Sequence, residues 1–147
     1  MIKTIVVGTD GSDTAAQAVV QAGELAEKLG AALVIVSAFE PVSETRLKDE
    51  RSEAPQDVSW AINEREDVDD MLGHVSAPLK ERGVDVRIAA RKGNPADAIL
   101  DIAEEEHADL IVVGNKGMAG ARRFLLGSVP NKISHHAPCS VLIVRTT

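Results

Sequence analysis

The sequence has few aromatic residues and no tyrosine. Its 147 residues contain two phenylalanines and one tryptophan, at Phe39, Phe124 and Trp60. Proteins that bind single-stranded nucleic acids without sequence preference stack successive bases on aromatic side chains, and three rings are too few for such a surface. The formal net charge of -7 at pH 7 also disfavours nucleic acids and anionic membranes as partners, because an acidic surface repels phosphate groups.

Cysteine is equally scarce, since Cys139 is the only one. A single cysteine cannot form an internal disulfide, which fits a reducing compartment. Its position just before an apolar run favours a buried structural thiol over a reactive one. The sequence shows no secretory signal pattern, and no apolar stretch approaches the ~20 residues that cross a bilayer. We therefore expect a cytoplasmic protein that does not use a membrane as a partner.

Five short apolar segments are spaced along the chain, and four of them are continuous runs rich in valine and isoleucine. The five are Thr4–Gly8, Ala32–Ser37, Val84–Ala89, Leu110–Gly114 and Val141–Val144. Continuous runs of this length are typical of strands that are buried on both faces of a parallel sheet. The segment Val84–Ala89 alternates between apolar and polar residues instead, which indicates an edge strand with one wetter face.

Helical patterns lie between these segments. The first is a stripe of apolar residues followed by a stop at Gly30; its members are Ala16, Val19, Val20, Ala26 and Leu29. A second helix is predicted over residues 62–82. A third begins after Asn94, which suits a helix cap, with Pro95 in the first turn. A fourth begins near Ser128 and ends before Pro138.

Alternating strands and helices predict an α/β fold, with a doubly wound five-stranded parallel sheet, strand order 3-2-1-4-5, and helices on both faces. One domain is expected to span residues 1–147. Residues 40–59 are polar and contain two prolines, so we expect a flexible insertion loop there. In such folds ligands bind at the carboxyl ends of the strands where the winding direction reverses, here between the first and fourth strands.

Glycines with a defined spacing follow the fourth predicted strand. Gly114 and Gly117 are separated by two residues, and nine more residues lead to Gly127 and Ser128. Glycine lets the backbone approach a ligand closely, and its N–H groups can then face anionic oxygens. Ser128 would begin the last helix, where free N–H groups and the helix dipole favour a phosphate. The segment is therefore a candidate phosphate-binding loop.

The turn after the first strand faces the same predicted crevice. Asp10 is placed to accept a hydrogen bond from a ribose hydroxyl or a base amine, or to hold Mg²⁺ through oxygen. We favour ligand contact for Asp10 because of its place at the switch point. For Ser12 and Asp13 we favour a role in capping the first helix.

The spacing G-2x-G-9x-G-S resembles the signature of ATP-binding universal stress proteins. The chain matches it at Gly114, Gly117, Gly127 and Ser128, and the opening IVVGTDGSD and the closing SVLIV resemble the same family. The resemblance extends over nearly the full length. It implies an adenine-nucleotide-binding stress-response regulatory protein, with ATP, AMP or cyclic AMP as ligand.

The resemblance also implies roles for individual residues. Thr9 and Asp10 would contact adenine and ribose, and the backbone of Ala38, just after the second strand, would meet the adenine edge. Val113 and Gly114 would line the ribose and phosphate side. The positions that resemble phosphate-binding ones are Gly117, Gly127, Ser128 and Val129.

Two further features follow from the family likeness. Pro130 occupies a position where family members often carry a small polar residue, so one hydroxyl contact to the phosphates is missing. Family members commonly form homodimers by pairing their last strands, here Ser140–Val144. An apolar strand at a sheet edge invites such pairing.

Other classes of protein fit the sequence less well. The P-loop string and the glycine pattern of dinucleotide-binding domains do not occur. A receiver domain would need an aspartate after the third strand, where Ala90–Lys92 stands. A nucleotide-independent interaction module stays open. So does a slow ATPase or autokinase, in which Asp10 with a metal would act with Arg122 or Arg123; no catalytic residue is assigned and no more than weak ATP hydrolysis is expected.

Overall fold

The computed structural model describes residues 1–39, 64–115 and 128–146. Strands and helices alternate along these segments. The strands are β1 (Thr4–Gly8), β2 (Ala32–Phe39), β3 (Val86–Lys92), β4 (Leu110–Gly114) and β5 (Ser140–Val144). The helices are α1 (Asp13–Leu29), α4 (Glu64–Glu81), α5 (Pro95–Glu105) and α6 (Ser128–His136). The loop predicted over residues 40–59 lies outside the described segments.

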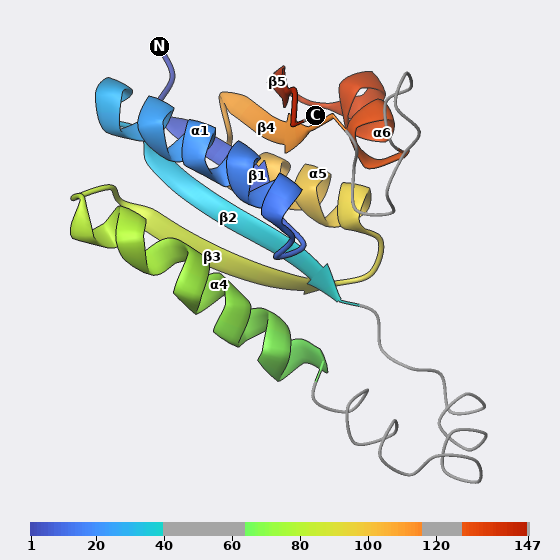
Figure 1. Ribbon diagram of the computed structural model, residues 1–147. Helices are drawn as coiled ribbons and strands as arrows, with labels where there is room; N and C mark the ends of the chain where they lie inside the picture. Colours follow the sequence, from blue (N-terminus) through green and yellow to red (C-terminus); the bar gives the residue numbers. More distant parts are fainter. Residues whose placement is uncertain (40–63, 116–127, 147) are drawn as a thin grey trace, which may run out of the picture.

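The strands form one parallel sheet with the order β3-β2-β1-β4-β5. This order is the one predicted from the sequence. Helices α1 and α4 cover one face of the sheet, and α5 and α6 cover the other (Figure 1). The winding direction reverses between β1 and β4, which are neighbours in the sheet although β2 and β3 lie between them in the chain.

Each central strand contributes to two hydrophobic cores. In β1, Ile5 and Val7 pack on the α1 and α4 side, whereas Val6 packs on the α5 and α6 side. All three side chains are fully buried. Successive side chains of a strand point to opposite faces, so a strand covered on both sides needs apolar residues at every position. This requirement explains the continuous apolar runs.

Strand β3 differs from its prediction at both ends. It begins at Val86 rather than Val84, because the N–H of Val84 donates to the carbonyl of Leu79 in the turn that ends α4. It continues to Lys92, which pairs with Phe39 at the end of β2. The extension beyond Ala89 follows from the length of the partner strand, which the local sequence does not encode.

Helix α1 has a cap at Ser12 and a stop at Gly30, and its buried face includes Val19 and Ala26 of the predicted stripe but not Ala16. The Ser12 side chain accepts a hydrogen bond from the N–H of Ala15, and Gly30 adopts the left-handed conformation that ends the helix, at φ 64°. Val20 and Leu29, predicted to lie on the apolar stripe, are exposed. The buried face is made mostly of small residues, namely Ala18, Val19, Ala22, Gly23 and Ala26.

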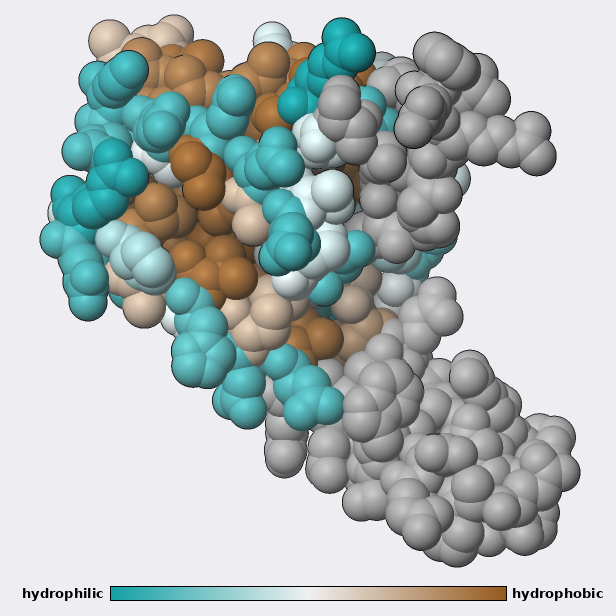
Figure 2. Space-filling view, in the orientation of Figure 1, coloured by the Kyte–Doolittle hydropathy of each residue, from teal (hydrophilic) through white to brown (hydrophobic). Residues whose placement is uncertain are grey.

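Apolar side chains also reach the surface over α1 and α4. Figure 2 shows them in brown, with polar side chains around them. Four half-buried members pack against the core beneath, namely Leu25, Val68, Met71 and Val75. No helix in the described part of the chain combines the length and apolar character that crossing a bilayer requires.

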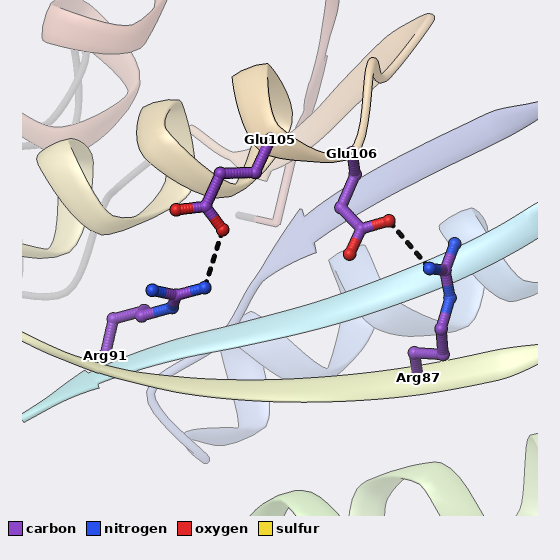
Figure 3. A network of polar contacts seen from close by, with 4 residues as sticks. All are labelled: Arg87, Arg91, Glu105 and Glu106. Carbon is purple, nitrogen blue, oxygen red and sulfur yellow. Dashed lines mark hydrogen bonds and ion pairs between the residues drawn. The ribbon is translucent and has the colours of Figure 1, made fainter.

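The acidic end of α5 is paired with β3. The run Glu104–Glu106 predicts a solvated helix end, but Glu105 lies 2.6 Å from Arg91 and Glu106 lies 2.7 Å from Arg87 (Figure 3). These ion pairs hold the helix over the edge strand. Because the side chains are partly exposed, we expect each pair to contribute about 0–1 kcal/mol.

Candidate functional site

The predicted site residues that the structure describes lie at the carboxyl edge of the sheet. All five strands are parallel, so their carboxyl ends share one edge. Helices α1, α5 and α6 each run back from that edge to the start of the next strand. β1 pairs with β4 through Val7 and Val112, which brings the turn after Gly8 next to Gly114. Strand pairing thus places the two candidate ligand-binding segments side by side.

A turn held by its own polar groups follows β1. The N–H of Thr9 donates to the carbonyl of Val36 on β2, at 2.9 Å. The N–H of Gly11 donates to Thr9 Oγ1 at 3.1 Å, and the N–H of Ser12 donates to Asp10 Oδ1 at 2.9 Å. Thr9 is buried, whereas Asp10 is exposed. The turn fixes the Asp10 carboxylate on the surface of the carboxyl edge.

Gly11 is required by the shape of this turn. Its φ is +83°, which favours glycine, and a Cβ built on it would lie 3.0 Å from Cγ of Met71 on α4. A side chain at this position would therefore be strained by the backbone conformation and would require Met71 to shift. Ser12, rather than Asp13, is the helix cap, and Asp13 is the first helical residue.

Ala38 lies within β2 and not after it. It pairs with Arg91 of β3, is half-buried, and packs against the core on the α5 and α6 side. The prediction that Ala38 follows the strand is wrong, because β2 continues to Phe39. Ala38 is still the second-last residue of β2, next to the carboxyl edge of the sheet.

At the end of β4, backbone groups rather than side chains are available to a ligand. Val113 is buried in the core on the α5 and α6 side, so its side chain is occupied by packing. Gly114 is half-buried, and the nearest atom to a Cβ built on it would be Cγ2 of Thr146, at 3.4 Å. This is ordinary contact distance, so the fold itself tolerates a methyl group at Gly114.

Helix α6 begins at Ser128, as predicted. Ser128 is exposed, while Val129 and Pro130 are buried in the first turn. A proline costs little there, because the first N–H groups of a helix have no partner within it. Four other predicted residues lie outside the described part of the chain, namely Gly117, Arg122, Arg123 and Gly127.

Three hydrogen bonds at this edge were not predicted from the sequence. Asn115, the first residue after β4, donates its N–H to the carbonyl of Val144, at 2.9 Å. Its Oδ1 accepts from the N–H of Thr146 and from the hydroxyl of Thr146, both at 2.9 Å. We call this set of three hydrogen bonds the Asn115–Thr146 clasp. Asn115 and Thr146 are 31 residues apart in the chain, so no local pattern could reveal it.

The described residues contain no group of three His, Cys, Asp or Glu side chains arranged to hold a metal ion. Cys139 is half-buried and packs against the core. Burial raises the pKa of its thiol, and the negative charge of Asp109 raises it further. This upward shift of the pKa agrees with a structural role for Cys139.

The architecture is that of a doubly wound α/β protein whose winding direction reverses between β1 and β4. The model of the universal stress protein family matches residues 1–145. The chain belongs to that family. The universal stress protein Rv1636 of Mycobacterium tuberculosis is 39% identical over 146 residues, which cover 99% of this chain and 97% of the relative.

Two solved structures of similar proteins contain adenine nucleotides. A universal stress protein in complex with cAMP is 34% identical, with a TM-score of 0.72, and the match covers 99% of this chain and 98% of that one. A universal stress protein from Archaeoglobus fulgidus in complex with dAMP is 27% identical, with a TM-score of 0.67, covering 97% and 98% of the two chains.

Proposed function

We propose that this protein binds an adenine nucleotide at the carboxyl edge of its sheet, between β1 and β4, and acts as a cytoplasmic regulatory protein in a stress response. The observation that carries the proposal is the meeting of three features at one edge: the Thr9–Ser12 turn, the glycine end of β4, and the start of α6. The relatives solved with cAMP and dAMP support the ligand class.

The nucleoside would lie over the ends of β1 and β2. Asp10 is exposed and its carboxylate can accept from a ribose hydroxyl or a base amine. Thr9 is buried, so it would shape the floor beneath the base. The backbone of Ala38 would meet the adenine edge, while the backbone of Val113 and Gly114 would line the ribose side.

The phosphates would lie toward α6. Gly117 and Gly127 would supply backbone N–H groups, and Ser128 and Val129 would add the N–H groups of the first helical turn. With ATP as ligand, a Mg²⁺ ion would be held chiefly by phosphate oxygens. The turn after β1 offers Asp10 as an acidic ligand, and the described residues contain no cluster of metal-binding side chains that could hold the ion without the phosphates.

Titration calorimetry with ATP, AMP and cAMP tests this function. We expect at least one of them to bind the purified protein. The variant Gly114→Ala should fold as the wild type does, because its methyl group meets only Thr146 at contact distance. It should bind the nucleotide more weakly. Absence of binding at millimolar concentration of all three nucleotides would favour the nucleotide-independent interaction module, and phosphate release with ATP would favour the slow ATPase.

The homodimer belongs to the same proposal. Strand β5 lies at the edge of the sheet, carries no charged residue between Ser140 and Val144, and has three half-buried apolar side chains. An edge of this kind readily pairs with a second copy. We expect a dimer in sedimentation equilibrium, and Leu142→Lys should shift it toward monomer. A monomeric wild type at millimolar concentration would exclude the dimer.

A further inference from the structure

We propose that Asn115 and Thr146 are positioning residues that fix the start of the phosphate-binding segment against the end of β5. The inference rests on the proposed function, since it concerns how the same site holds a phosphate tail. It assigns a role to two residues that the glycine spacing does not include. Neither residue is proposed to contact the nucleotide.

The clasp secures both the backbone and the side chain of Asn115. The backbone N–H of Asn115 extends the ladder between β4 and β5 by donating to Val144. The side-chain Oδ1 accepts two hydrogen bonds, both from Thr146. A residue held at two points in this way has little freedom of orientation, so the direction in which the chain leaves β4 is set at Asn115.

Thr146 is suited to the task by burial and shape. It is 8% exposed, so water competes little for its hydroxyl, and hydrogen bonds are stronger in such surroundings. Its methyl carbon Cγ2 lies 3.4 Å from where a Cβ of Gly114 would be. Thr146 therefore faces both Gly114 and Asn115, the last residue of β4 and the one that follows it.

Order at this point should lower the cost of binding a phosphate tail. A binding segment that is held in its bound direction before the ligand arrives loses less conformational entropy on binding. The segment between Asn115 and Ser128 carries the two remaining glycines of the signature, and both of its ends are placed by the fold: Ser128 by α6 and Asn115 by the clasp. The clasp thus acts on phosphate binding and not on the nucleoside.

A comparison of ATP with adenosine tests whether the clasp affects phosphate binding and leaves nucleoside binding unchanged. Thr146→Val keeps the shape of the side chain and removes the hydroxyl donor, while Asn115→Ala removes the acceptor. We expect Thr146→Val to bind ATP about tenfold more weakly in calorimetry, the effect of losing roughly one buried hydrogen bond, and Asn115→Ala, which loses two, to bind it at least as weakly. Adenosine, which has no phosphate, should bind both variants as it binds the wild type.

Two control variants sharpen the test. Thr146→Ser keeps the hydroxyl and should retain the affinity of the wild type for ATP. Asn131→Ala changes an exposed asparagine on α6 and should alter neither affinity. Thermal denaturation of every variant shows whether the fold is kept, and Thr146→Val provides the test if Asn115→Ala does not fold.

The outcomes separate this inference from the proposed function. If the wild type binds neither ATP nor adenosine, the proposed function fails and the inference falls with it. If the wild type binds ATP and both clasp variants bind it equally well, the inference alone is overturned. An equal loss of ATP and adenosine affinity would also overturn it, because the clasp would then act through general stability.

Discussion

Replacing Gly117 with valine should abolish tight nucleotide binding while leaving the fold intact. The branched side chain would stand where the backbone is proposed to approach the phosphates. Hydrogen bonds to a charged group contribute about 1.5–3 kcal/mol each, so the loss of two of them corresponds to about 100-fold or more in affinity. Calorimetry with ATP measures the loss.

The same experiment with adenosine shows where the loss arises. Adenosine should bind Gly117→Val as it binds the wild type, because the nucleoside would lie over β1 and β2 rather than over the phosphate segment. Circular dichroism should report the helix content of the wild type. Undiminished affinity for ATP in this variant would remove Gly117 from the proposed site.

The central strands could be predicted because burial on both faces leaves continuous apolar runs in the sequence. Ile5, Val6 and Val7 are all apolar since both faces of β1 are covered, and the same holds for β2 and β4. Strand ends were predicted less well. Residues Ala90–Lys92 carry no apolar run, and they are part of β3 only because β2 extends to Phe39 and offers them partners.

The buried face of α1 could not be predicted fully from the local pattern of apolar residues. The exposed Val20 and Leu29 look like core residues, while the buried Ala18 and Ala22 carry a weak hydrophobic signal. Small residues occupy the buried face where α1 packs on the sheet, and Gly23 faces Leu79 of α4. These contacts are a property of the packed structure.

The candidate site also contains both local motifs and contacts that depend on the packed structure. The turn at Thr9–Ser12 and the glycines after β4 are local motifs, and they could be recognised from spacing. The Asn115–Thr146 clasp joins the ends of β4 and β5, and it exists only because those strands are neighbours in the sheet. The ion pairs of Glu105 and Glu106 with β3 arise in the same way.

Replacing Gly23 of α1 with valine should destabilise the protein. A Cβ at Gly23 would lie 2.5 Å from Cδ2 of Leu79 and 3.3 Å from its Cδ1. Leu79 is buried and cannot swing into solvent, so α1 and α4 would have to move apart. We expect a net loss of about 2 kcal/mol, seen as a fall in melting temperature of about 4–8 °C.

Gly73→Val is the matched control, because Gly73 lies on α4 with no atom within 4 Å of the added Cβ. Valine is a better helix former than glycine by a few tenths of a kcal/mol, so this variant should be slightly stabilised. Adding Leu79→Ala to Gly23→Val should cost less than the sum of the single changes, since the smaller side chain makes room. Equal melting temperatures for the two glycine variants would mean that α1 and α4 do not approach each other at Gly23.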